Sequence, residues 1–202
     1  MKIGILISGR GSNMMAIVDA VKSGEIPNSE VAIVISDKAS AEGLRKAKEK
    51  NIETLIIEKN GRKRAEHDAE IVAELKKRKV ELVCLAGYMR LLSPEFIKSF
   101  PNRILNIHPS LLPAFKGLDA QKQAIQYGVK FSGCTVHFVD ESLDGGAVLA
   151  QKVVEVKDDD TPESLAARIL EHEHALYIET LKKIVGENFK IAGRRVIVVA
   201  LT

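Results

Sequence analysis

An amide and an imidazole stand two residues apart in the segment Asn106-Ile107-His108-Pro109-Ser110. The apolar residues just before this segment are typical of a buried strand, and Pro109 would end that strand because proline cannot continue a sheet ladder. Alternate residues of a strand point to the same side, so we expect Asn106 and His108 to face the same side at the strand's carboxyl end. Asparagine can stabilise an oxyanion, and histidine can transfer a proton near neutral pH. The alternative is a strand end where both side chains only satisfy backbone groups.

A carboxylate that could assist the histidine lies in the loop Leu143-Asp144-Gly145-Gly146. Two glycines allow such a loop to shape itself around a ligand. A carboxylate that lies close to an imidazole favours the charged form of the ring. An aspartate that precedes glycine is more often a solvated turn residue, and that interpretation stays open.

The segment Gly9-Arg10-Gly11-Ser12-Asn13 joins an apolar run at 2–8 to a helical pattern. Glycines let the backbone approach a ligand closely, and the free amides at a helix start attract anions. The turn is neither a Walker loop nor a complete GxGxxG motif. We predict a phosphate site of the mononucleotide type, and the alternative is a tight turn capped by Ser12 or Asn13.

Two other places could belong to a site. The loop Gly87-Tyr88-Met89-Arg90-Leu91-Leu92 follows a predicted strand and would face a cleft, although Met and Leu are usually core residues. Glu173 falls on the apolar stripe of a predicted helix, where a carboxylate needs a partner. His172 and His174 flank Glu173 without the i, i+4 spacing of a helical metal pair, so we predict no metal site.

The elements that would position these residues alternate between strand and helix in the first half of the chain. Apolar runs predict strands at 2–8, 30–36, 52–57 and 82–86, and apolar stripes predict helices from the first turn to Gly24, at 41–50 and at 62–79. This alternation with short connections predicts an α/β fold with a Rossmann-like, mostly parallel sheet and helices on both faces.

The second half of the chain has a different pattern. Patterning predicts helices at 94–99, 118–127 and 162–185, a strand at 103–108, an antiparallel pair at 131–139 and 147–156, and a terminal hairpin at 189–191 and 195–200. Thr161-Pro162 has the residue types of a helix N-cap and first turn. No linker separates the halves, so we predict a single domain with at most a lobe boundary near residue 100.

Composition limits the function classes. The chain has 202 residues, 46% hydrophobic content and a net charge of +3, which suits a compact domain and does not favour a nucleic-acid partner. No stretch reaches the length of a membrane span or a signal sequence, so we expect a cytoplasmic protein. Cys84 and Cys134 lie in apolar runs and are expected to be core residues of a reducing compartment.

Eight segments together resemble one family. They are LISGRGSN at 6–13, SDK at 36–38, Arg64, LAGYMRLLS at 85–93, LNIHPSLLPAFKG at 105–117, GCTVHFV at 133–139, LDGGAVLAQ at 143–151 and EH at 173–174. The set resembles the phosphoribosylglycinamide formyltransferases, folate-dependent enzymes of purine synthesis. LNIHPSLLP and LDGG are shared by folate formyltransferases in general, whereas SGRGSN narrows the resemblance to the ribonucleotide enzymes.

The resemblance implies roles for particular residues. The catalytic residues would be Asn106, His108 and Asp144. The ribonucleotide would bind to Gly11, Ser12, Asn13 and Glu173. The co-substrate 10-formyltetrahydrofolate would bind to Arg64, Met89, Arg90, Leu91, Leu92, Asn106, Asp140 and Glu141. The whole chain, 1–202, would be one formyltransferase domain, with a phosphate-binding half at 1–100 and a folate-binding, catalytic half at 101–202. The enzyme would be a monomer or homodimer without a metal.

Two positions depart from the family pattern, and rival interpretations remain. Leu170 stands where some members have a glutamine, and Asp119 stands where many have a histidine. The closest rivals are methionyl-tRNA formyltransferase, formyltetrahydrofolate deformylase and the sugar-nucleotide formyltransferases. We expect the first to carry an additional C-terminal domain and the second an N-terminal regulatory one. A non-catalytic nucleotide-binding module would need the phosphate turn but not the three catalytic residues.

Overall fold

A computed structural model describes residues 1–199 of the chain. The chain divides into two compact units, of which the first is Met1–Asn106 and the second begins at Ile107. Each unit has its own sheet strands and its own helices, and they are described in turn below. The prediction of a single domain with halves that meet near residue 100 stays a prediction.

The first unit is built on parallel strands. The strands are β1 (Lys2–Ile7), β2 (Glu30–Ser36), β3 (Thr54–Ile56), β4 (Leu82–Leu85) and the start of β5 (Ile104–His108). They lie in the order β3-β2-β1-β4-β5, and every neighbouring pair is parallel. The carboxyl ends of these strands therefore lie at one edge of the sheet, where α/β folds bind ligands.

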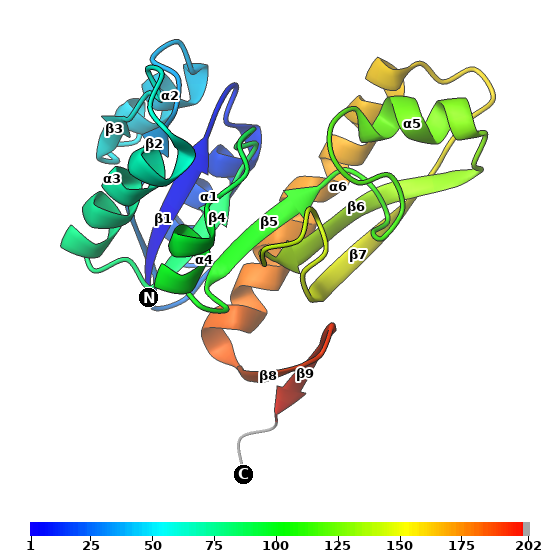
Figure 1. Cartoon of the computed structure of the whole chain (residues 1–202). Coiled ribbons are helices and arrows are strands. Elements are labelled where there is room, and N and C mark those ends of the chain that lie inside the picture. Colours follow the sequence, from blue (N-terminus) through cyan, green and yellow to red (C-terminus); the bar gives the residue numbers. More distant parts are fainter. Residues whose placement is uncertain (200–202) are drawn as a thin grey trace. The chain divides into compact units, whose positions relative to one another are not determined.

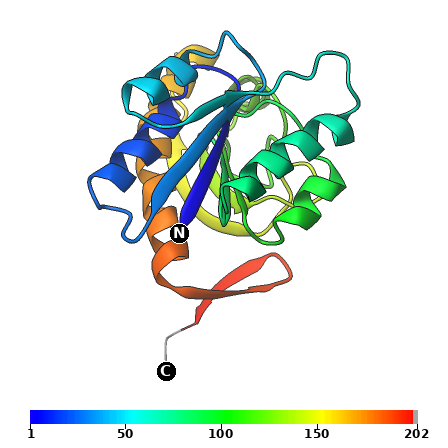
Figure 2. The same ribbon diagram turned by 90° about the vertical axis from the view of Figure 1, so that its left-hand side faces the viewer.

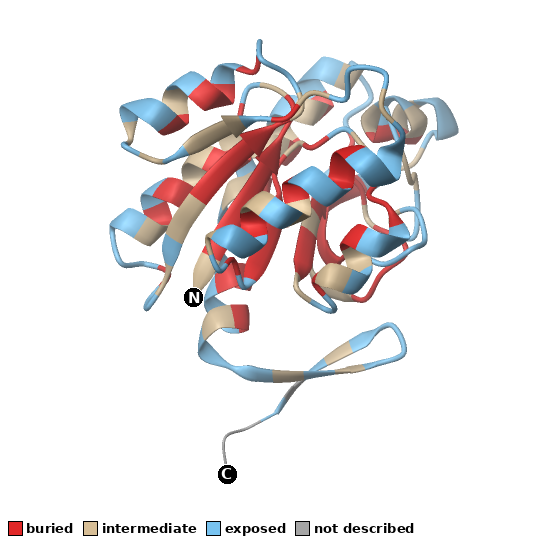
Figure 3. Ribbon diagram, turned by 60° about the vertical axis from the view of Figure 1, so that its left-hand side comes forward, coloured by how far each residue is buried: buried red, intermediate tan, exposed pale blue. Residues whose placement is uncertain are grey.

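Helices cover both faces of this sheet. They are α1 (Ser12–Lys22), α2 (Glu42–Glu49), α3 (Arg64–Lys77) and α4 (Pro94–Ser99). Figure 2 shows α1 and α2 on one side of the strands and α3 and α4 on the other. Strands that are covered on both faces need continuous apolar runs. The central strands meet this need, because all four residues of β4 and the last five of β1 are buried (Figure 3).

The second unit combines an antiparallel pair with a long helix. Its elements are α5 (Ala120–Tyr127), β6 (Phe131–Phe138), β7 (Val148–Glu155), α6 (Pro162–Gly186), β8 (Asn188–Ala192) and β9 (Arg195–Val199). Strands β6 and β7 are antiparallel, β7 and β9 are parallel, and β8 and β9 form an antiparallel hairpin. Helix α6 packs against β6 and β7 (Figure 1).

The predicted fold class is confirmed, with small differences at element ends. Parallel strand pairs outnumber antiparallel ones, as expected for a mixed, mostly parallel sheet. Helix α5 begins at Ala120 and not at Leu118, because Asp119 has a left-handed backbone conformation with φ of 55°. The predicted last strand extends to Ala200, which lies outside the described residues. No helix within residues 1–199 is long and apolar enough to cross a membrane.

Candidate active site

The second unit brings together His108 and Asp144, two of the three predicted catalytic residues. His108 is the last residue of β5 and only 5% exposed. Its Nδ1 lies 3.5 Å from Oδ2 of Asp144, and its Nε2 lies 2.8 Å from the carbonyl oxygen of Phe115. A carbonyl can only accept a hydrogen bond, so Nε2 carries a proton. The other ring nitrogen, Nδ1, is the one that faces the carboxylate of Asp144.

The backbone of two loops fixes the position of Asp144. The N–H of Gly117 donates a hydrogen bond of 2.8 Å to Oδ2 of Asp144. Asp144 itself has a φ of 44°, a left-handed conformation that aspartate tolerates better than most residues. Two positions further on, a Cβ on Gly146 would lie only 1.9 Å from the carbonyl oxygen of Phe138, so the loop requires glycine there. The sequence therefore folds this loop so that the carboxylate points back to the imidazole.

His137, a second histidine, also lies near Asp144. Its Nε2 is 3.9 Å from Oδ1 of Asp144, and its Nδ1 is 2.8 Å from the carbonyl oxygen of Phe138. His137 is 2% exposed, and burial holds its pKa below the ordinary value. It is therefore neutral near pH 7, and it does not compete with His108 for the charge of Asp144.

Asn106, the third predicted catalytic residue, is the last residue of the first unit. It lies on β5 opposite Leu85 of β4 and is half-buried. Strand β5 runs from Ile104 to His108, so Asn106 and His108 are alternate residues of one strand. Alternate side chains of a strand leave the backbone on the same side.

The predicted phosphate turn lies at the start of α1. Gly11 is the N-cap of this helix and has a φ of 71°, and a glycine has no side chain that could cap the helix. The interpretation of a tight turn capped by Ser12 or Asn13 stays open. A Cβ on Gly11 would lie 2.8 Å from Cα of Gly43, so glycine is needed here for packing as well as for its conformation.

The remaining contacts leave the start of α1 suited to an anion. The N–H of Gly43 donates to the carbonyl of Gly9 at 3.0 Å, which holds the turn against the start of α2. The amides of a first helical turn have no partner within the helix and carry the positive end of its dipole. Ser12 is half-buried and Asn13 is 7% exposed. A phosphate group therefore stays the predicted ligand of this turn.

The other predicted ribonucleotide residue, Glu173, lies on α6 in the second unit. It is 8% exposed, as the apolar stripe predicted. Its negative charge acts on Cys134 of β6, whose thiol pKa is raised to about 12 by burial first and by Glu173 second. Both cysteines of the chain are buried and free, which confirms their prediction as core residues. Within residues 1–199, no group of three or more His, Cys, Asp or Glu could hold a metal ion.

The predicted folate loop of the first unit presents apolar side chains to solvent. Met89 and Leu91 are 62% and 53% exposed, whereas Leu92 is 8% exposed and Arg90 is half-buried. Exposed apolar side chains grouped on one loop are typical of a binding surface. Arg64, also predicted to bind folate, is the exposed first residue of α3.

The predicted folate residues of the second unit lie just before Asp144, the predicted catalytic aspartate. Asp140 and Glu141 are both exposed, in the loop that leads from β6 to Asp144. Asp140 Oδ1 accepts hydrogen bonds from the backbone N–H of Ser142, at 2.9 Å, and from its hydroxyl group. The carboxylate of Asp140 therefore stabilises the conformation of its own loop.

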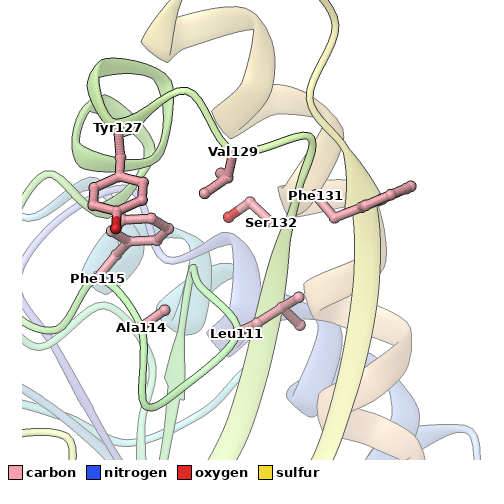
Figure 4. Close-up of a pocket in the computed structure, with 7 residues that line it drawn as sticks. All are labelled: Leu111, Ala114, Phe115, Tyr127, Val129, Phe131 and Ser132. Atoms are coloured by element: carbon pink, nitrogen blue, oxygen red, sulfur yellow. The ribbon is translucent and has the colours of Figure 1, made fainter.

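A cavity of about 430 Å³ lies in the second unit. Its lining residues are Leu111, Ala114, Phe115, Tyr127, Val129, Phe131 and Ser132. None of these was predicted as a site residue. Figure 4 shows the rings of Phe115 and Tyr127 next to one another, with their centroids 5.9 Å apart. Phe115 thus lines this cavity with its ring and contacts His108 with its carbonyl.

Comparison with known proteins decides the family. The model of the formyl transferase family matches residues 1–181. The chain belongs to the formyl transferase family. This confirms the resemblance predicted from the motifs around Asn106, Asp144 and the first turn.

The relatives of the chain differ in how much of their own length it covers. The chain is 44% identical to the "Phosphoribosylglycinamide formyltransferase" of Haemophilus influenzae, over 90% of this chain and 85% of the relative. It is 46% identical to the "Trifunctional purine biosynthetic protein adenosine-3" of Chironomus tentans over 90% of this chain, but spans only 13% of that protein. The solved structure of "glycinamide ribonucleotide transformylase 1 from Symbiobacterium toebii" is 47% identical and matches with a TM-score of 0.96, covering 99% of this chain and 94% of that one.

Several residues around the predicted site were not identified from the sequence. Phe115 and Gly117 act through backbone groups, which have no signature in residue type. Gly43 is identified only by its close approach to Gly11. His137 did have a signal, because an imidazole in the middle of an apolar strand must be buried with a partner.

Proposed function

We propose that this protein transfers the formyl group of 10-formyltetrahydrofolate to the amino group of phosphoribosylglycinamide in purine biosynthesis. The products are formylglycinamide ribonucleotide and tetrahydrofolate. The observation that carries the proposal is the identity of 44% to the Haemophilus influenzae enzyme of this name, over 85% of that enzyme's length. The contact between His108 and Asp144 supplies a suitable acid, and the turn at Gly11 supplies a suitable phosphate site.

The reaction begins when the lone pair of the glycinamide nitrogen attacks the formyl carbon. A C–N bond forms, and the carbonyl electron pair moves to the oxygen, which becomes an oxyanion. The bond from carbon to the folate nitrogen then breaks as this nitrogen gains a proton, and the attacking amine loses one. The amine is itself the nucleophile, so none of these steps requires a covalent enzyme intermediate.

Three side chains assist this sequence. Asn106 donates its amide hydrogens to the developing oxyanion. His108 donates a second hydrogen bond to the oxyanion or a proton to the leaving folate nitrogen, and Asp144 orients the ring through its contact with Nδ1. In the structure the Nε2 hydrogen of His108 is directed to the carbonyl of Phe115. The substrate must therefore replace that carbonyl before His108 can act.

The two substrates use different groups of residues. The phosphate of the ribonucleotide binds to the amides and hydroxyl of Gly11, Ser12 and Asn13, and the ribose hydroxyls bind to Glu173. The folate binds to Arg64, Met89, Arg90, Leu91, Leu92, Asn106, Asp140 and Glu141. None of these roles calls for a metal ligand. The protein would work in the cytoplasm as a monomer or homodimer.

A coupled assay tests the proposal directly. Tetrahydrofolate formation from 10-formyltetrahydrofolate is measured with and without phosphoribosylglycinamide, and we expect turnover only with the ribonucleotide present. Formate release in its absence would identify a deformylase, and transfer to methionyl-tRNA would identify the tRNA enzyme. Lack of turnover with every acceptor would favour a non-catalytic nucleotide-binding module.

A further inference from the structure

The loop between β4 and α4 carries Met89 and Leu91, whose side chains are 62% and 53% exposed. Exposed side chains such as these two cannot fix a loop by packing, so backbone hydrogen bonds act beside the buried side chains of Tyr88 and Leu92. At the start of the loop, the N–H of Ser8 donates to the carbonyl of Gly87 at 3.1 Å. The N–H of Met89 donates to the hydroxyl of Ser8 at 3.0 Å. The first half of the loop is therefore attached to the end of β1.

The second half of the loop is attached to α3 by a carboxylate. The backbone N–H of Ser93 donates a hydrogen bond of 2.6 Å to Oδ2 of Asp68. Hydrogen bonds to an ionised acceptor are shorter and stronger than neutral ones, and this one is short. Asp68 is 1% exposed, and it lies one helical turn after Arg64. One short segment of α3 therefore carries a proposed folate residue and holds the loop that carries the others.

His67 holds Asp68 in place from its other side. The imidazole is fully buried, and its Nε2 lies 2.7 Å from the carbonyl oxygen of Ile57, to which it must donate. Its Nδ1 lies 3.4 Å from Oδ1 of Asp68. The pair is thus oriented at both ends, by Ile57 and by Ser93.

We propose that Asp68, oriented by His67, is a positioning residue that fixes the loop 89–92 in the conformation that binds the folate. The inference rests on the proposed folate role of this loop. A buried carboxylate is a poor source of stability, because apolar residues of the same size often stabilise a core more. One oxygen of Asp68 instead accepts a hydrogen bond from the backbone of the loop, and this bond helps to set the conformation of the loop.

Kinetics with both substrates test the proposal. Asp68→Ala removes the acceptor for Ser93, and loss of a hydrogen bond to a charged group should raise KM for 10-formyltetrahydrofolate about tenfold or more. KM for phosphoribosylglycinamide should stay unchanged. Asp68→Asn keeps an oxygen that can face Ser93 and an amide that can face His67, so it should restore most of the folate affinity.

The matched control is Asp160→Asn, which changes another buried carboxylate in the second unit. Asp160 accepts hydrogen bonds from Arg168 and Ser164 and has no proposed role in substrate binding. The Asp160→Asn substitution should lower stability without changing the KM of either substrate. Hydrogen exchange gives a second readout, because the amides of residues 87–93 should exchange faster in Asp68→Ala than in the wild type while those of α1 do not.

Distinct outcomes would overturn distinct claims. Absence of formyl transfer by the wild type would refute the proposed function itself. Normal wild-type transfer with an unchanged folate KM in Asp68→Ala, and only a lower melting temperature, would refute the positioning role. Equal loss of folate affinity in Asp68→Asn and Asp68→Ala would also refute it, because the charge and not the hydrogen-bond acceptor would then matter. A rise in the ribonucleotide KM alone would refute the folate role of the loop.

Discussion

Which chemistry His108 can perform depends on which of its ring nitrogens can be reached by a substrate. Both ring nitrogens of His108 are engaged in the structure, one by Asp144 and one by the carbonyl of Phe115. Only the contact with Phe115 can be exchanged for a substrate without losing the contact between the ring and the carboxylate of Asp144. The mechanism therefore assigns different tasks to the two nitrogens, with Nδ1 for orientation and Nε2 for proton transfer.

Asn106→Ala should lower kcat more than it raises either KM. The amide's hydrogen bond strengthens only as the oxyanion develops, so its loss is felt mainly in the transition state. Removal of one such donor typically lowers kcat about a hundredfold or more. Steady-state kinetics with each substrate varied in turn gives the comparison. If only the KM values rose, Asn106 would be a binding residue and not a catalytic one.

Asp144→Asn should keep the shape of the side chain and remove its charge. A neutral amide no longer favours the protonated ring of His108, so kcat should fall about a hundredfold or more, the range of general acid catalysis. Binding of both substrates should survive, which calorimetry can measure. His137→Gln is a useful control. The Nε2 of His137 lies 3.9 Å from the carboxylate of Asp144, and burial lowers the pKa of this histidine. An Asp144→Asn variant with a normal kcat would show that Asp144 does not assist His108 as the acid of the reaction.

The sequence could predict residues whose types carry chemistry, but not the groups that hold them. Asn106, His108 and Asp144 were predicted as catalytic residues because an amide, an imidazole and a carboxylate have recognisable chemical uses. The carbonyl of Phe115 and the N–H of Gly117 were not found, because every residue has these groups. His67 and Asp68 were missed for another reason: the helix that holds them has a polar sequence, and charged residues on such a helix are usually solvated.

At the scale of elements, the predicted order of strands and helices was correct because apolar periodicity is a strong local signal. The exact ends were less predictable. Helix α1 begins after Gly11, which lies so close to Gly43, more than 30 residues away, that a Cβ at this position would not fit. Helix α6 is the opposite case, because Thr161 caps it by accepting a hydrogen bond of 3.2 Å from the N–H of Ser164, as its sequence indicated.

The start of α6 should make stability depend on pH. The guanidinium of Arg168, followed by the hydroxyl of Ser164, holds the pKa of Asp160 well below its usual range. A lowered pKa means that the folded state binds the proton less tightly than the unfolded state, so this contribution is complete above the ordinary value of 3.8 and is lost as pH falls below it. Wild type should therefore exceed Asp160→Asn in free energy of unfolding at pH 7, with the difference shrinking toward pH 3.

Urea denaturation at pH 7, 5 and 3 measures this difference. The gap between the two proteins should be the same at pH 7 and pH 5, because the carboxylate is ionised in both the folded and unfolded states at either pH. A gap that shrank between pH 7 and pH 5 would mean that another group, and not Asp160, controls the acid sensitivity.

For the molecule as a whole, the proposal assigns the ribonucleotide phosphate to the start of α1 in the first unit and the His108–Asp144 pair to the second. A ligand that binds only the folded state stabilises it by an amount set by its concentration relative to Kd. At a hundred times Kd this amounts to about 2.7 kcal/mol, so phosphoribosylglycinamide should raise the melting temperature without any folate present.

The phosphate is the group on which this stabilisation should depend. Glycinamide riboside, which lacks the phosphate, should raise the melting temperature far less at the same concentration, because the helix amides then have no anion to bind. Asp160→Asn should show the same shift as the wild type, although its starting temperature is lower. Substitution of Gly11 is a poor test, since any Cβ there meets Gly43 at 2.8 Å and disturbs the turn itself. Equal shifts from the riboside and the ribonucleotide would show that the first turn does not bind phosphate.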